Sequence, residues 1–492
     1  MTGHTVGLIL LLPFFAAIAM PMLGSWRRSW CRPLALSSVG FMVLSALSAS
    51  YVAVTQGPVQ YAVGGWSPPV GIVLILDGFS SLVAVVLSFV SLACLFFGGP
   101  VLPKDLGGKV VPYHTLVLLL ISALAGVTLA GDLFNLFVFL EVAALCSYAL
   151  VGLAGGRGLM AAFRYLLLGT IGASFYLLGV GYLYAATGTL NMADFLARLP
   201  DALHSKAVFT GLIFIFLGLA IKAAMVPFHG WLPDAYSHAP EAVVPLLASL
   251  VTKVSLYAMT RITFWVLGAA TLAFELPILF LLGLGGAIAA VVGAFLALTQ
   301  QDLRRMFAYG GISHVGLIII GIAVGNKTGF AGGIFYLVND AVMQATLFFI
   351  AGAIWRRCGA RELSQLGHLW AQMPWTSAAL IITGLSMIGI PPTGGFFGKW
   401  YMVLGALEAT NYVSVAAILS STLLTLAYFV RIIERMFGEI PPDMAVVQFT
   451  AEAPAEMRVS MGILAASILV LGLFSDQMVG LILRSALPPG LG

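Results

Sequence analysis

Charged residues are scarce in this chain: Asp, Glu, Lys and Arg together make up 9% of its 492 residues. A soluble domain usually carries about 25% charged residues, so this chain lacks the polar surface that water requires. Its formal net charge is only +4, and no basic stripe stands out, so nothing indicates binding to nucleic acid. The shortage of charge predicts a protein that is surrounded largely by lipid.

Cysteine is rare as well. The four cysteines, Cys31, Cys94, Cys146 and Cys358, lie far apart and form no C-x-x-C pair, which argues against an iron–sulfur cluster, a zinc site or a disulfide framework. The seven histidines show no paired helical spacing that would hold haem. The glycine-rich stretch at 283–293 lacks the strand and the acidic residue of a dinucleotide site. We therefore expect this chain to hold no metal and no redox cofactor.

Apolar residues make up 61% of the chain and form runs of the roughly 20 residues that a helix needs to cross a bilayer. The runs are continuous rather than alternating, which favours helices over a β-barrel. The first run, at 6–22, is expected to be a spanning helix rather than a cleavable signal peptide. We predict an all-α integral membrane protein with about fourteen transmembrane helices, at residues 6–23, 34–55, 71–98, 113–130, 134–153, 160–186, 207–227, 242–268, 273–299, 306–325, 330–354, 375–409, 411–437 and 458–483.

Lysine and arginine are distributed unevenly between the two membrane faces. Most of them fall in odd-numbered connections and the adjoining span ends, whereas the even-numbered ones hold only Arg198, Lys206, Arg261 and Lys327. The basic side of a membrane protein faces the cytoplasm. We therefore expect a multi-pass protein of a prokaryotic plasma (inner) membrane with both termini on the outer side.

Two of the predicted spans are interrupted by proline. The seventh ends in KAAMVPFHGWLP, which contains Pro227, and the twelfth contains IGIPPTGGFFGKW, with Pro391 and Pro392. Proline breaks the helix hydrogen-bond ladder, and such breaks are tolerated where they are buried in protein or line a cavity. Because the breaks lie five spans apart, we predict two inverted five-helix repeats, spans four to eight and nine to thirteen. The expected regions are spans one to three (1–112), the first repeat (113–268), the second repeat (273–437), and a cytoplasmic connection with the final helix (438–492).

Ionisable residues inside the spans are the most informative feature of the sequence. A charge at the centre of a span costs about 2.5–3.5 kcal/mol on insertion scales, so each one needs a partner or a purpose. The candidates for a proton or ion pathway are Glu141, Lys222, Lys253, Asp340, Lys399 and, near the start of span ten, His314.

These charges have a functional and a structural interpretation. A dry environment disfavours the charged form of a lysine or a glutamate, and proximity of the two favours it. Moving Glu141 toward or away from Lys222 would therefore switch the proton affinity of the lysine. Static ion pairs that fix helix register are the alternative. Five ionisable positions on five spans, two of them at broken helices, favour the pathway.

Several further residues are weaker candidates for an entrance or a relay. Tyr257 lies on the helical face of Lys253, and Gln344 lies on the face of Asp340. His229 and His238 flank the loop after the first break, although loop histidines are more often simply solvated. His314 is equally compatible with a buried core histidine. Asp77 is expected to be a helix N-cap or an interface residue at the start of span three.

Four segments carry a further signal when they are taken together: GDLFNLFVFLEVAALCSYALVG, KAAMVPFHGWLPDAYSHAPEAVVPLLASLVTKVSLYAMTRI, QQDLRRMFAYGGISHVGLIIIG and IGIPPTGGFFGKWYM. They resemble the proton-antiporter family shared by respiratory complex I and the multisubunit Mrp cation/proton antiporters. The first and second segments are most similar to the D-type subunit of Mrp antiporters. They are also similar to the corresponding subunits of membrane-bound hydrogenase-type complexes. The likeness covers roughly residues 70–440.

The resemblance implies a fourteen-helix subunit with two inverted repeats and a central hydrophilic axis. Glu141 and Lys222 would match the family's glutamate and lysine pair of spans five and seven. Lys253 would match its connecting lysine, and Lys399 its terminal lysine. Many relatives have His-Ala in span eleven and a lysine four residues after the histidine. Here Asp340 and Gln344 take the places of that histidine and lysine, so the central relay could follow a different proton route or accept a cation.

The resemblance also implies partners in the lipid bilayer. These would be antiporter-like and small hydrophobic membrane subunits, with or without a peripheral redox arm, and the transported ions would be H⁺ and, as an option, Na⁺. Whether the assembly is an enzyme stays open. The competing classes are a lone carrier of an organic substrate, a quinone- or cofactor-binding redox subunit, and a scaffold whose charges no longer conduct.

Overall fold

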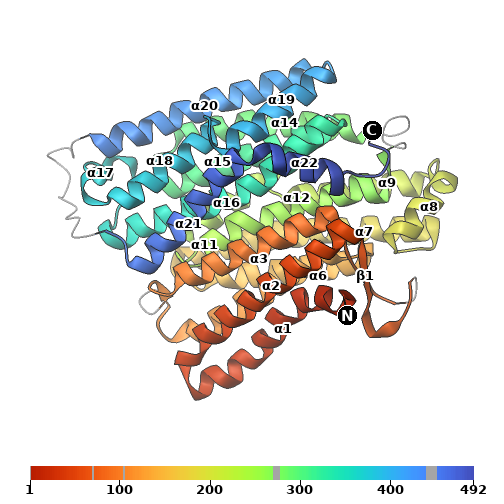
Figure 1. Cartoon of the computed structure of the whole chain (residues 1–492), viewed down its shortest axis with the longest axis horizontal. Coiled ribbons are helices and arrows are strands. Elements are labelled where there is room, and N and C mark those ends of the chain that lie inside the picture. The colour runs from red at the N-terminus through yellow and green to blue at the C-terminus, as the bar shows by residue number, and fades with distance from the viewer. Residues whose placement is uncertain (1, 69–70, 103–105, 270–276, 439–451, 492) are drawn as a thin grey trace.

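The protein is described by a computed structural model that covers residues 2–68, 71–102, 106–269, 277–438 and 452–491. Its long helices lie side by side along the long axis of the molecule (Figure 1). Within the described ranges, eleven helices are long and apolar enough to span a membrane. They are α1 (Thr2–Trp26), α2 (Cys31–Gln56), α3 (Gly78–Gly98), α5 (Val110–Leu129), α6 (Leu133–Gly152), α7 (Gly156–Thr187), α14 (Ile278–Thr299), α15 (Leu303–Ala323), α16 (Lys327–Cys358), α20 (Tyr412–Phe437) and α21 (Ala455–Leu473).

Three more apolar segments are interrupted. The first consists of α9 (Lys206–Lys222), η4 (Phe228–Gly230) and α10 (Trp231–His238). The second runs through α11 (Val244–Leu246), η5 (Leu247–Val251), α12 (Thr252–Arg261) and η6 (Ile262–Val266), where η5 and η6 are π-helical. The third consists of α18 (Pro374–Ile388) and α19 (Gly394–Glu408). An all-α membrane protein is therefore confirmed, and a count of fourteen spans depends on treating each interrupted segment as one.

The remaining elements are short and connect the spans. They are η1 (Arg28–Trp30), β1 (Val59–Ala62), η2 (Val63–Gly65), β2 (Val73–Leu76), η3 (Gly107–Lys109), α8 (Met192–Ala202), η7 (Leu363–Gln365), α17 (Leu369–Gln372) and α22 (Ser475–Ser485). Strands β1 and β2 form an antiparallel hairpin with Val59 opposite Leu76. The hairpin was not predicted, and β2 lies within the expected 71–98 span, whose helix begins only at Gly78. Strands of four residues leave too short a pattern to recognise.

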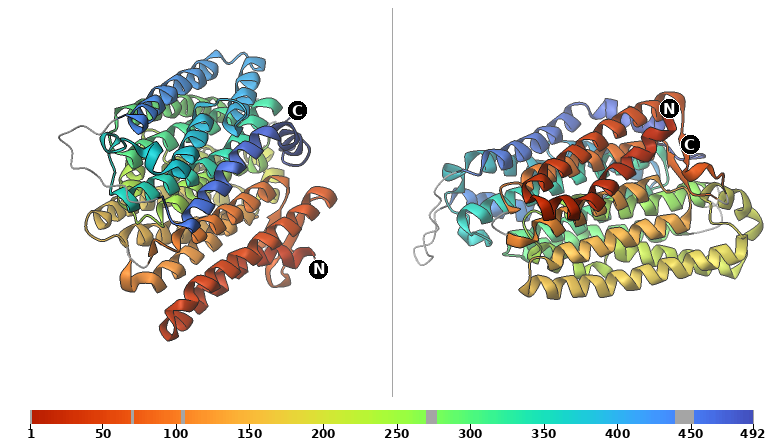
Figure 2. Two further views of the ribbon diagram at one scale, coloured as in Figure 1. Left: turned by 60° about the vertical axis from the view of Figure 1, so that its left-hand side comes forward. Right: turned by 90° about the horizontal axis from the view of Figure 1, so that it is seen from below.

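Helix α16 lies at the centre of the bundle. Its most apolar 18-residue window is completely buried, whereas the corresponding windows of α1 and α2 are 39% and 33% buried. It packs against α3, α15, α19 and α21. Helices α1 and α2 lie at one side of the molecule and α20 lies at the opposite side, as Figures 1 and 2 both show. Polar groups within that window of α16 are therefore shielded from lipid.

Local sequence explains where the spans begin and stop. Asp132 caps α6 by accepting a hydrogen bond from the Asn135 amide at 2.6 Å, and Asp302 caps α15 in the same way through the Arg305 amide at 2.8 Å. The twelfth span, 375–409, is interrupted at Pro391 and Pro392 as expected: α18 ends at Gly389, whose φ of +87° suits glycine, and α19 starts at Gly394. Several expected ranges lie partly outside the described residues: the 1–112 region, the start of the 273–299 span and of the 273–437 repeat, and the 438–492 region.

Candidate functional site

Glu141 and Lys222 form the first ion pair inside the membrane-spanning region. Glu141 lies midway along α6 and Lys222 is the last residue of α9, directly before the first break. The Lys222 Nζ donates a hydrogen bond to the Glu141 Oε1 at 2.6 Å. The end of a helix favours a cation because its last carbonyl groups point toward it. The lysine side chain is 8% exposed and the glutamate side chain 24%, so the carboxylate is the more accessible partner.

Asp340 joins two other predicted residues at the centre of the bundle. One carboxylate oxygen, Oδ2, lies 2.7 Å from the Lys253 Nζ, and the other, Oδ1, lies 2.6 Å from the His314 Nδ1. The Lys253 Nζ also donates to the Ala248 carbonyl at 2.9 Å. All three side chains are almost completely buried, with exposures of 0–3%. We call Lys253, Asp340 and His314 the central cluster.

Lys399 lies beside the second break. Its Nζ donates to the carbonyl oxygens of Met387 and Ile388 at 2.8 and 3.2 Å, and to the Thr422 hydroxyl at 3.1 Å. Met387 and Ile388 are the last residues of α18, so the interruption supplies backbone acceptors that an intact helix would use internally. The break thus creates the binding place for this buried ammonium group.

The helices that carry these groups form a continuous series. Helix α9 packs against α12, α12 packs against α15, α15 packs against α16, and α16 and α15 both pack against α19. The Glu141–Lys222 pair, the central cluster and Lys399 therefore lie on neighbouring elements. We refer to this series of groups as the axis.

The weaker candidates take different places. The Tyr257 hydroxyl donates to the Thr128 carbonyl at 2.7 Å, one turn along α12 from Lys253. Gln344 is buried on α16 and lies against Gly311. The His238 Nδ1 lies 2.9 Å from the Asp234 carbonyl, and the His229 ring lies 6.3 Å from the Tyr309 ring. The structure therefore places both histidines on the connection after Pro227 and not among the residues of the axis.

Three further sets of charged residues, which were not assigned to a site from the sequence, form ion pairs within each set. Glu241 and Arg304 form a buried ion pair, and the half-buried Asp77 pairs with the buried Arg261. A third group has Asp234 between Arg164 and Arg305, at 2.7 and 2.9 Å. In the sequence, these arginines indicated only the orientation in the membrane. Buried arginine at a span end was the signal, because it is rarely left without a carboxylate.

Asp77 is also the N-cap of α3, as predicted. Its Oδ1 accepts a hydrogen bond from the Ser80 amide at 2.9 Å, and its own amide donates to the Ser80 Oγ at 2.8 Å. This reciprocal arrangement is a capping box. Its second carboxylate oxygen remains for Arg261.

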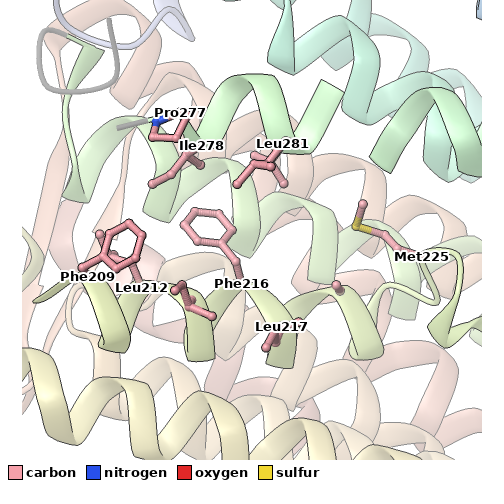
Figure 3. Close-up of a pocket in the computed structure, with 11 residues that line it drawn as sticks. Phe209, Leu212, Phe216, Leu217, Met225, Pro277, Ile278 and Leu281 are labelled. Carbon is pink, nitrogen blue, oxygen red and sulfur yellow. The ribbon is translucent and has the colours of Figure 1, made fainter. Parts of the chain in front are cut away.

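A cavity of about 280 Å³ between α9 and α14 is separate from the axis. It is lined by apolar side chains, among them Phe209, Phe216, Met225 and Leu281 (Figure 3). A carrier of a polar organic substrate would need convergent polar groups in such a space. Among the described residues, no group of three or more His, Cys, Asp and Glu could hold a metal ion.

The chemistry that the axis allows is proton exchange between close acids and bases. In the Glu141–Lys222 pair and in the central cluster, carboxylate oxygens lie 2.6–2.7 Å from an ammonium or imidazole nitrogen. Burial makes the charge of each group depend strongly on the charge of its neighbour. A small movement of one helix would therefore change which group holds the proton.

The chain is similar to known membrane proteins. A family described as "NADH:quinone oxidoreductase/Mrp antiporter, TM" matches residues 130–425. The chain is 41% identical to NADH-quinone oxidoreductase subunit N of Desulforudis audaxviator, covering 99% of each chain. It is 33% identical to the D-type subunit of the Na(+)/H(+) antiporter of Alkalihalophilus pseudofirmus, covering 81% of each.

The fold matches a solved assembly as well. A chain of the Mrp complex from Dietzia sp. superposes with a TM-score of 0.89 at 27% identity, covering 98% of this chain and 96% of that one. The predicted resemblance is thus confirmed at the level of sequence and of fold. This chain belongs to the NADH:quinone oxidoreductase/Mrp antiporter family of multi-pass membrane subunits.

Proposed function

We propose that this chain is a proton- or cation/proton-translocating subunit of a multisubunit membrane complex, similar to the D-type subunit of Mrp antiporters. The observation that carries the proposal is Asp340, which contacts Lys253 on one side and His314 on the other. A carboxylate shared by two bases inside a dry bundle suits proton transfer. A static pair would need only one of the two bases.

The proposed route follows the axis. Glu141 receives or releases a proton at the more exposed end of the first pair, and Lys222 responds because its ammonium charge is balanced by that carboxylate. The central cluster passes the charge between Lys253 and His314 through Asp340. Lys399 ends the series beside the second break. Two inverted repeats, 113–268 and 273–437, would give this series its two halves.

A second candidate is the ion-pumping membrane subunit of a complex I-like redox complex, of the NADH dehydrogenase or membrane-bound hydrogenase type. The 41% identity to an NADH-quinone oxidoreductase subunit favours it. The axis would be the same in both cases, and the driving force would come from the partners. Mass spectrometry of the complex isolated from native membranes distinguishes them. Hydrophilic iron–sulfur or nickel subunits would indicate a redox pump, and small hydrophobic partners with another antiporter-like chain would indicate an exchanger.

The proposed setting is the plasma membrane of a prokaryote, with both termini outside and other membrane subunits as partners. The arginine-rich connections support this orientation. The transported ions would be H⁺ and, in an exchanger, Na⁺.

The proposal is tested by Lys222→Ala in the purified complex reconstituted into vesicles. We expect coupled proton movement to fall on the order of tenfold or more, because a proton-transfer group of the pathway is lost, while the amount of assembled complex stays close to normal. The control is Arg198→Gln, which removes an exposed ion pair with Asp194 on α8 and should leave transport unchanged. Loss of the complex from the membrane would instead indicate a structural ion pair.

A further inference from the structure

An apolar groove runs along α9 and the start of α14 (Figure 3). It is lined by six residues of α9 from Phe209 to Ala220, by Met225 beyond the end of that helix, and by four residues from Pro277 to Leu282. The α9 residues recur every three or four positions, so they form one face of the helix. All eleven side chains are apolar, and we call this space of about 280 Å³ the α9–α14 groove.

The two helices that form the groove are separated from each other. Helix α9 packs against α7, and α14 packs against α15 and α20, but α9 and α14 come close to each other at almost no point. Met225 links them at one end, because a Cβ added to Gly285 of α14 would lie 3.3 Å from the methionine Cε. The methionine therefore closes the end of the groove that lies next to the first break.

The rest of the groove opens outward. Phe209 and Leu281 are 52% and 60% exposed, whereas Met225 is 5% exposed. Because α9 and α14 belong to membrane-spanning segments, these exposed apolar side chains lie within the hydrocarbon region of the bilayer. A molecule of the bilayer can therefore enter the groove from the side.

The length of the groove matches one leaflet of a bilayer. Phe209 and Ala220 are eleven residues apart on α9, which corresponds to about 16 Å along a helix. Half of the hydrocarbon core is about 15 Å thick. The exposed Lys206 starts α9 three residues before Phe209, and a phosphate group is a suitable partner for its ammonium. The groove therefore extends from one membrane face to the depth at which α9 is interrupted.

The lining decides what can occupy the groove. A cavity of about 150 Å³ that is lined only by apolar side chains stays dry and binds apolar molecules. The α9–α14 groove is larger and has no polar side chain in its lining, so water is not a suitable occupant. The occupant must be apolar and elongated, and it must come from the bilayer.

We propose that the α9–α14 groove binds one acyl chain of a phospholipid, with the end of the chain against Met225 and the phosphate beside Lys206. This inference goes beyond the proposed function and does not depend on it. The bound chain fills the space between α9 of the proposed first repeat and α14 of the proposed second repeat. Because Met225 lies three residues after Lys222, the chain also packs against the connection that follows the first ion pair.

The first test is photolabelling of the assembled complex in vesicles. The probe is phosphatidylethanolamine with a diazirine at the end of one acyl chain. We expect its cross-links to concentrate on Met225 and Phe216, at several times the yield found on α20, which also exposes apolar side chains. Equal yields on the groove and on α20 would overturn the proposal. So would the absence of cross-links in the groove, which would mean that a partner subunit covers it.

A groove-filling variant shows whether the labelled place is a defined site. Ala220→Phe places a ring inside the groove, and Ala416→Phe adds the same ring to the exposed face of α20 as a matched control. We expect Ala220→Phe to lower the cross-linking of Met225 several-fold and Ala416→Phe to leave it unchanged. Unchanged labelling in Ala220→Phe would overturn the proposal, and so would labelling by a photoactivatable isoprenoid quinone in place of the phospholipid. If Ala220→Phe does not assemble, the labelling of the unaltered complex still decides.

Thermal stability gives an independent readout. A ligand that binds only the folded state stabilises it by mass action, so removal of phospholipid should lower the thermal midpoint of the complex and its return should restore it. We expect Ala220→Phe to lose part of this dependence, since its ring replaces part of the acyl chain, and Ala416→Phe to keep it. Equal dependence in both variants would contradict a site in the groove. Because Lys222→Ala leaves the groove intact, the proposed function and the lipid site can fail separately.

Discussion

The buried lysines differ in what balances their charge. Lys222 and Lys253 each contact a carboxylate, at 2.6 and 2.7 Å. Lys399 contacts two carbonyls and a hydroxyl, and no carboxylate lies within 4.0 Å of its Nζ among the described residues. An uncompensated buried charge reduces stability. The proposed function accounts for this charge, because it gives Lys399 a role in transport.

Lys399→Met should therefore separate function from stability. Methionine fills a similar volume without the charge, so we expect the thermal midpoint of the purified complex to stay equal or rise. Coupled transport should fall on the order of tenfold or more. Differential scanning measurements and the vesicle assay together check this prediction. A lower midpoint with normal transport would mean that the lysine is needed for packing alone.

Single residues also show what the sequence could and could not predict. The sequence predicted a pathway role for Glu141, Lys222 and Lys399, because a charge within an apolar run has few explanations. The contacts of Asp340 with both Lys253 and His314 could not be predicted, since they join three helices whose relative positions the sequence pattern does not contain. The same reason explains why Asp77 was predicted as a cap but not as the partner of Arg261.

At the level of elements, the sequence predicted the long spans, but it predicted their interruptions only in part. Proline in the sequence predicted both breaks. The sequence did not show the π-helical turns η5 and η6 within the 242–268 span. Pro391 and Pro392 did predict that the 375–409 span is divided, and its two parts, α18 and α19, contact each other at the break. That packing depends on glycine: a Cβ at Gly395 would lie 1.8 Å from the Ser386 carbonyl oxygen.

Gly395→Ala should therefore disturb the break that holds Lys399. Overpacking of this kind typically costs about 1–3 kcal/mol, so we expect a lower thermal midpoint and reduced transport. Gly462→Ala, on α21, is the matched control because a Cβ there would meet nothing within 4 Å. Thermal unfolding of the two purified complexes measures the difference. Equal midpoints would show that the α18–α19 packing tolerates the methyl group.

At the scale of the whole molecule, the central cluster joins two parts of the chain. Lys253 belongs to the proposed first repeat, and Asp340 and His314 belong to the proposed second repeat. The cluster lies on and beside α16, the helix whose apolar window is completely buried. A proton that travels from the Glu141–Lys222 pair to Lys399 would have to pass this cluster. The proposed proton route along the axis therefore depends on Asp340.

The most direct test is coupled proton transport by the purified complex that carries Asp340→Asn. Asparagine keeps the size of the side chain but cannot exchange protons with Lys253 and His314. Glu408→Gln is the control, since Glu408 is an exposed carboxylate that contacts Asn326 and Thr328 at the end of α19. We expect the control to transport normally and Asp340→Asn to lose transport on the order of tenfold or more, with the complex assembled in normal amounts. Normal transport by Asp340→Asn would contradict the proposed axis.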